Sequence, residues 1–135
     1  MKIMKAGSRP TKQASSDWFT GTVWQDPIFE APEPARARAL NVAFEPGART
    51  AWHTHPLGRT LHVVSGVGLV GLRNEQPQVI NAGDSVWVPQ GEEHWHGATA
   101  SNSVTHIAIQ EALNGRVAEW LEKVSDEDYS IATDA

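Results

Sequence analysis

Residues 47–66 read GARTAWHTHPLGRTLHVVSG and residues 83–94 read GDSVWVPQGEEH, and these two stretches carry the strongest information about the fold. Both consist of short β-forming runs separated by glycine and proline, which favour turns. Side chains two residues apart on a strand point to the same face, so His53 and His55 are expected to project together. The pattern indicates an all-β protein with histidines gathered on one face of a strand.

The middle of the chain repeats this pattern on both sides of the two stretches. The expected strands are ARALNVAF (37–44), TAWHTH (50–55), RTLHVVSGVGLVGL (59–72), PQVI (77–80), SVWVP (85–89), HWHGAT (94–99) and SVTHIAIQE (103–111). Short strands with turn signals at regular intervals are typical of a β-sandwich or β-barrel. No segment in this region has a sustained helical period.

The two ends differ from this middle. Residues 1–36 are rich in polar and turn-forming residues, which predicts an N-terminal arm with an edge strand. A barrel core is expected over 37–112. In the segment 113–135, apolar residues recur at helical spacing, which predicts a C-terminal helix followed by a tail. These apolar residues are Val117, Trp120, Leu121 and Val124. All three parts are expected to form one domain.

Composition excludes several classes of protein. The chain has 135 residues, 40% of them hydrophobic, with a formal net charge of −5. Nucleic-acid binding needs clustered lysine and arginine, so we expect no such partner. No apolar run approaches the roughly 20 residues that span a bilayer, and no secretory signal is evident. The absence of cysteine excludes disulfides and thiolate ligands, and it fits a cytoplasmic protein.

The six histidines all lie between positions 53 and 106. His94 and His96 repeat the spacing of His53 and His55, and His106 shares a strand face with Ala108 and Gln110. Any one histidine is more often a satisfied core or surface residue than a ligand. Two such pairs in one small domain favour a metal site, because imidazole is a common ligand of divalent metals.

The spacing of particular residues adds a family resemblance. The residues that carry it are Gly47, His53, His55, Gly66, Gly83, Pro89, Gly91 and His94, with 16 residues between the two stretches. In these positions the chain resembles the cupins. The resemblance implies a jelly-roll barrel, a double-stranded β-helix, with His53, His55 and His94 as ligands of one divalent metal ion. Ala98 departs from the pattern at a position where an asparagine is usual.

Arg59 is the more important departure, because cupins usually have a glutamate or glutamine ligand there. A guanidinium stays protonated and has no lone pair for a metal. Three outcomes are open, and we expect the first. Arg59 swings out and leaves a three-histidine site with open positions, or it points inward and binds an anion beside the metal, or it has abolished the metal site.

The finer resemblance is to small bacterial cupins of the hydroxynitrile lyase type, which cleave (R)-cyanohydrins with a manganese-type ion. DWFTGTVWQDPIFEAP (17–32) and THIAIQEALNG (105–115) are among the stretches that carry it. The resemblance implies His106 as the catalytic base, with His96 beside it. The expected substrate pocket consists of Leu40, Val42, Trp52, Arg59, Trp87 and Gln110. Manganese is the favoured ion, with iron, zinc or nickel as alternatives.

Two other functions remain open for the same site. One is a cupin dioxygenase or isomerase that acts on a small oxygenated substrate. The other is a non-catalytic cupin that binds an anion through Arg59. In each case we expect a small-molecule ligand, no membrane partner and a homo-oligomer, either a dimer or a tetramer.

Overall fold

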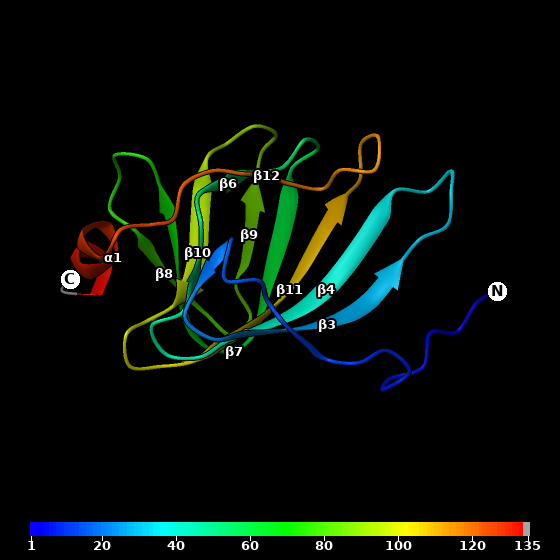
Figure 1. Cartoon of the computed structure of the whole chain (residues 1–135), viewed down its shortest axis with the longest axis horizontal. Helices are drawn as coiled ribbons and strands as arrows, with labels where there is room; N and C mark the ends of the chain where they lie inside the picture. Colours follow the sequence, from blue (N-terminus) through cyan, green and yellow to red (C-terminus); the bar gives the residue numbers. More distant parts are fainter. Residues whose placement is uncertain (134–135) are drawn as a thin grey trace.

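Short strands follow one another along almost the whole chain in the computed structural model, which describes residues 1–133 (Figure 1). The strands are β1 (Lys12–Gln13), β2 (Phe19–Thr20), β3 (Val23–Glu30), β4 (Ala37–Phe44), β5 (Arg49–Thr50), β6 (His53–Thr54), β7 (Arg59–Leu72), β8 (Gln78–Asn81), β9 (Ser85–Val88), β10 (His94–Ala98), β11 (Val104–Glu111) and β12 (Glu119–Trp120). One helix, α1 (Asp126–Thr133), follows them. No helix in this described part is long and apolar enough to cross a membrane.

The strands form two antiparallel sheets that share β7 and curl toward each other (Figure 1). Sheet A has the order β1-β3-β4-β11-β7-β9, and sheet B contains β2, β5, β6, β7, β8, β10 and β12. The strand β7 changes sheet near Gly66, which has φ of 84°. A Cβ atom there would lie 2.0 Å from the carbonyl oxygen of Ser103, so only glycine fits this crossing.

The two sheets enclose a core that is apolar at one end of the lumen. This inner cluster consists of Phe19, Val23, Val42, Phe44, Ala48, Val63, Ile80, Ala98 and Val104. A second cluster lies on the outer face of sheet B, where α1 and the segment before it cover the strands (Figure 1). This outer cluster consists of Trp52, Leu69, Trp95, Val124 and Tyr129.

The jelly-roll architecture predicted from the sequence is confirmed. The strands β4 and β7 coincide with the expected runs 37–44 and 59–72. Within the segment 1–36, β3 is a full strand of sheet A that pairs with β4 over most of its length. The arm is therefore shorter than its composition suggests.

A C-terminal helix is present as predicted, but its expected position is wrong. Residues 119–120 form β12, which pairs with β6, and the amide of Leu121 donates to the carbonyl oxygen of Trp52. These pairings cover a sheet edge and outweigh the helical period of the sequence. The helix begins only at Asp126, where the hydroxyl of Ser125 accepts a hydrogen bond from the amide of Asp128.

Candidate functional site

Three of the predicted site histidines lie together inside the barrel. His53 on β6 is directly opposite His94 on β10, and their ring centroids are 4.2 Å apart. The ring of His55 lies 4.9 Å from that of His53 and 5.4 Å from that of His94. All three side chains are fully buried. Strand pairing thus brings together residues about forty positions apart in the sequence.

Hydrogen bonds to the backbone determine which nitrogen of each ring is free. The Nδ1 atom of His53, His55 and His94 lies close to a backbone carbonyl oxygen in each case. The acceptors belong to Ala51, Val117 and Glu92, at 2.9, 2.6 and 3.0 Å respectively. Because a carbonyl only accepts, Nδ1 carries the proton and Nε2 carries the lone pair. The Nε2 atoms of His55 and His94 are buried without a hydrogen-bond partner.

These lone pairs fit a divalent metal ion. A metal-binding histidine commonly donates its other ring N–H to a carbonyl, which orients the ring. By distance alone, the group whose ligand atoms lie within 4.8 Å of one another is His53, His94 and His96. We favour His55 over His96, because Nε2 of His55 has no partner, whereas Nε2 of His96 accepts a hydrogen bond from Arg59 at 3.0 Å. The contact of the same Arg59 nitrogen with Nε2 of His53 is longer, at 3.4 Å.

Arg59 points into the lumen, which contradicts the expectation that it swings out. Its side chain is 8% exposed, and its Nε donates to Oε1 of Gln110 at 3.0 Å. Its Nη1 lies 3.4 Å from Nε2 of His53 and 3.0 Å from Nε2 of His96. Alternation explains this placement, because Arg59 lies opposite Gln110 in the sheet and shares its inward face. Burial lowers the pKa of Arg59 to about 9, so it remains protonated at neutral pH.

His96 and His106 form a hydrogen-bonded pair behind this arginine. Nδ1 of His96 and Nε2 of His106 are 3.0 Å apart. Arginine only donates, so Nε2 of His96 must be the acceptor and its Nδ1 must carry the proton. His106 then accepts at Nε2 and carries its proton on Nδ1, which is buried without a partner. In this hydrogen-bonded series, Arg59 therefore donates to His96, and His96 donates to His106.

All five lumen histidines are neutral at physiological pH. Burial is the main cause of the lowered pKa values, and the positive charge of Arg59 adds to it. The pKa is lowered to about 3 for His55 and His106 and to about 4 for His94. It lies well below the usual value for His53 and His96. Neutral imidazoles are the form that binds a metal or accepts a proton.

The other residues predicted for a substrate pocket fall into two groups. Val42 lies opposite His106 and Leu40 lies opposite Ala108, so both share the inward face with the histidines. Trp52 instead belongs to the outer cluster, where the guanidinium of Arg73 lies 3.9 Å from its ring centroid.

Trp87 is also outside the lumen, because it is 63% exposed on β9. The structure therefore does not bring Trp52 or Trp87 to the histidines. The sixth histidine, His62, is exposed on β7, and its Nδ1 lies 2.8 Å from the hydroxyl of Ser85.

Two contributors to the site were missed from the sequence. The ring of Trp120 lies 4.7 Å from that of His53, and the carbonyl of Val117 orients His55. Both belong to the segment expected to be helical. Because every residue has a backbone carbonyl, the identity of Val117 gives no indication of this role. The same segment borders a cavity of about 590 Å³, which has His55 in its wall and Arg116 and Glu119 among its lining residues.

Comparisons with known proteins agree with this fold. The family model described as "Cupin domain" matches residues 40–109. The chain is 50% identical to an (R)-mandelonitrile lyase from Granulicella tundricola over 129 residues, which cover 96% of this chain and 98% of that protein.

Two solved structures extend the likeness. A cupin-like protein from Thermotoga maritima has a TM-score of 0.84 at 38% identity, with 98% of each chain covered. A polyketide cyclase from Streptomyces resistomycificus has a TM-score of 0.74 at 14% identity, with 96% of this chain and 91% of that chain covered, and so shares the fold alone. From the matched family model, the barrel and these relatives together, this chain belongs to the cupin family.

Proposed function

We propose that the protein is a metal-dependent lyase that cleaves (R)-cyanohydrins to an aldehyde and hydrogen cyanide. The observation that carries the proposal is the buried cluster of His53, His55 and His94, two of whose Nε2 atoms have no partner. The 50% identity to an (R)-mandelonitrile lyase across nearly the whole chain supports the same reaction type and an enzymatic role.

His53, His55 and His94 would hold the ion through Nε2, with manganese favoured and iron, zinc or nickel as alternatives. A bound divalent ion would acidify the cyanohydrin hydroxyl, as it acidifies bound water. Their Nδ1 atoms keep their protons and donate them to backbone carbonyl oxygens, so the three rings would keep their orientation through a reaction cycle. The ligands are three neutral groups, which leaves coordination positions for substrate.

The neutral pair of His106 and His96 would handle the proton. One of the two histidines would take the hydroxyl proton as the aldehyde carbonyl forms. The bond between the carbinol carbon and the nitrile carbon would break, and its electron pair would leave with cyanide. The same proton is then returned to cyanide, which leaves as hydrogen cyanide. The proton would enter at Nε2 of His96 in place of the hydrogen bond from Arg59, and Nδ1 of His96 would pass its own proton to Nε2 of His106 across their 3.0 Å contact.

Leu40, Val42 and Gln110 would form the substrate pocket, because they share the inward face with His106. The two aliphatic side chains suit an apolar substituent on the cyanohydrin carbon. Trp52 and Trp87 lie outside the lumen, so we give them no role in binding substrate.

The test is release of benzaldehyde from (R)-mandelonitrile by the manganese-loaded protein at mildly acidic to neutral pH. We expect turnover above that of the metal-free protein, and its loss in His106→Ala. The matched control is His62→Ala, which removes an exposed histidine and should leave the rate unchanged. Equal rates with and without manganese would exclude the proposal.

A non-catalytic, anion-binding cupin is the second candidate, and the inward position of Arg59 favours it. It predicts that the protein binds a carboxylate without turning over any cyanohydrin, and that Arg59→Ala weakens this binding. Calorimetric titration with acetate, run beside the benzaldehyde assay, separates the two candidates.

We also propose a homo-oligomer, either a dimer or a tetramer. Large apolar side chains are exposed on the outer face of sheet A, and such patches often mark contacts between subunits. They include Val64, Trp87 and Ile109. The measurement is the molar mass in solution by light scattering. A cytoplasmic location remains a prediction from composition.

A further inference from the structure

Arg59 is a buried cation whose known partners are all neutral. Its contacts are the Oε1 atom of Gln110 and the Nε2 atoms of His53 and His96. None of the ion pairs found within residues 1–133 includes it. A buried charge without a counter-charge is unfavourable, because the surrounding protein does not replace its hydration. The lumen therefore favours the entry of an anion.

A metal ion in the same lumen would add a second positive charge and so strengthen the preference for an anion. Nη1 of Arg59 lies 3.4 Å from the Nε2 atom of His53, which is one of the proposed ligand atoms. A divalent ion held there would lie close to the guanidinium, and two positive charges at short range repel each other strongly in a poorly hydrated interior. An anion beside both charges turns this repulsion into two attractions.

The lumen has donors available for such an anion. No hydrogen bond from Nη2 of Arg59 is found within the described part of the chain. Because Oε1 of Gln110 faces Arg59, the amide nitrogen of Gln110 is also left to donate elsewhere. The neutral histidines accept at Nε2, so they do not compete for the role of donor.

We propose that Arg59 makes metal binding depend on an anion: the protein takes up its divalent ion together with a small monovalent anion that the guanidinium holds. The inference rests on the metal site of the proposed function but not on the lyase reaction. The anion is small, either linear or a short carboxylate, because the rings of His53 and His96 lie beside Arg59. Phe44 in turn packs on the rings of His96 and His106. Cyanide, the leaving group of the proposed reaction, is of this class.

The test is a calorimetric titration of Mn²⁺ into the metal-free protein, in a low-salt zwitterionic buffer, with and without sodium azide. Azide is a linear monoanion and serves as the probe. We expect azide to tighten the Mn²⁺ affinity by about tenfold, within the usual range of coupling between two sites. By linkage, Mn²⁺ tightens the azide affinity by the same factor.

Variants then assign the coupling to Arg59. In Arg59→Gln the Mn²⁺ affinity without azide should rise, and azide should no longer change it. Arg59→Lys keeps the charge and should keep part of the coupling. The matched control is Arg73→Gln, on the far side of sheet B from the lumen, which should behave as the unchanged protein.

Two results would overturn the inference: no effect of azide on the Mn²⁺ affinity, or the same effect in Arg59→Gln. Failure to bind Mn²⁺ under either condition would overturn it together with the proposed metal site. Coupling without any release of benzaldehyde from mandelonitrile would leave the inference standing and exclude only the lyase reaction. The two failures can therefore be told apart.

Discussion

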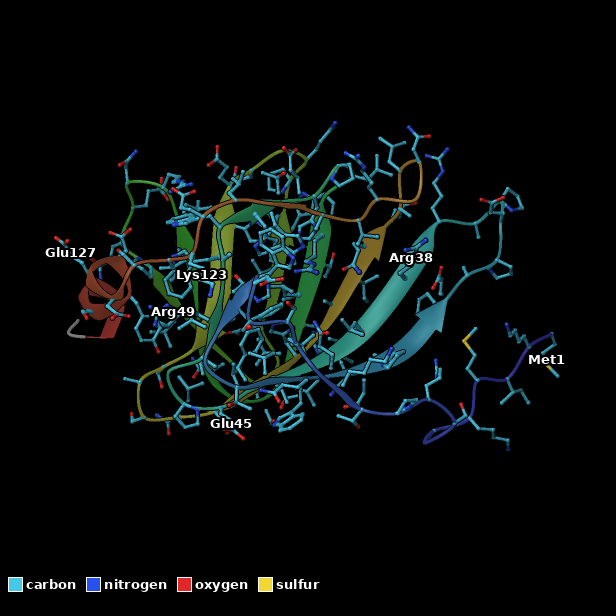
Figure 2. The ribbon with its side chains drawn as sticks, in the orientation of Figure 1. Met1, Arg38, Glu45, Arg49, Lys123 and Glu127 are labelled. Carbon is cyan, nitrogen blue, oxygen red and sulfur yellow. The ribbon has the colours of Figure 1, made fainter. Side chains whose placement is uncertain are left out.

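Two arginines, ten residues apart in the chain, are buried on opposite faces of the strand layer. Arg49 is 5% exposed and Arg59 is 8% exposed. Arg49 points to the outer cluster, where it donates to the carbonyl of Val124 at 3.0 Å and to the carboxylate of Asp126 at 2.7 Å. In Figure 2 it lies close to the C-terminal helix. Arg59 points to the lumen and contacts only neutral groups.

The charge of Arg49 is compensated and that of Arg59 is not, and this difference distinguishes the two faces of the strand layer. The guanidinium of Arg49 also lies 4.3 Å from the ring centroid of Tyr129, so its charge and its planar faces are both satisfied. It fastens the C-terminal segment to sheet B. Arg59 and its histidines leave charge and lone pairs unmatched, and such groups commonly mark a binding or catalytic site. The outer face therefore stabilises the fold, and the lumen is left ready for a ligand.

Lowering the pH should have the largest effect, because it should reduce the free energy of unfolding through the lumen histidines. Its five histidines have lowered pKa values in the folded state, so between pH 6.5 and about 4 the unfolded chain takes up protons that the folded one does not. Stability is then present above pH 6.5 and falls as the pH decreases, by up to about 1.4 kcal/mol per pH unit for each histidine.

Urea unfolding of the metal-free protein at pH 7 and pH 5 measures this loss. His96→Gln should reduce the slope against pH by one proton. The exposed His62 provides the control variant, His62→Gln. A stability that does not depend on pH would mean that these histidines take up protons as readily in the folded state as in the unfolded chain.

Truncation on the outer face should have the next largest effect on stability. Trp95 is 1% exposed and packs on Tyr129, with ring centroids 5.8 Å apart. Trp95→Ala should lower the free energy of unfolding by about 3–5 kcal/mol, because it leaves a cavity. Val79→Ala, which shortens an exposed side chain outside the proposed subunit contact, should change it by about 0.5 kcal/mol or less. Equal effects would contradict the assignment of the outer cluster as core.

Removal of the neighbouring lumen residue should change metal binding instead. His94 precedes Trp95 on β10 and points to the opposite face. His94→Ala should weaken the Mn²⁺ affinity by about 100-fold or more, with loss of turnover in proportion. Calorimetry measures the affinity, and circular dichroism serves as the control for folding. An unchanged affinity would remove His94 from the ligand set.

The smallest effects should come from the two arginines themselves. Arg49→Gln should cost about 2 kcal/mol, since it leaves the carbonyl of Val124 unpaired. Asp126→Asn should cost about 0.5 kcal/mol, because the Asp126 side chain is 96% exposed. Arg59→Gln should leave stability unchanged or raise it, because it removes an unmatched buried charge. Thermal and urea unfolding measure the change in the free energy of unfolding in each of the three variants. A large loss of stability in Arg59→Gln would contradict the view that its buried charge is unmatched.

Local signals were sufficient for most of the strands. Turn-forming residues lie at either end of the runs 37–44 and 59–72, so the bounds of these two strands could be predicted. The C-terminal helix shows the limit of such signals. Residues 119–120 fit a helical period, but β6 offers them backbone partners, and periodicity cannot reveal that an edge strand nearby is unpaired.

The candidate site divides in the same way. The barrel and the candidate histidines could be predicted from local patterns, because side-chain alternation and turn residues act over a few positions and the cupin motifs are defined by residue spacing. Three properties of the site could be found only in the folded chain: Arg59 points inward, Trp52 and Trp87 lie outside the lumen, and backbone carbonyls leave Nε2 of His55 and His94 free. These properties depend on which strand lies opposite and which segment covers it, and such contacts join residues distant in the sequence.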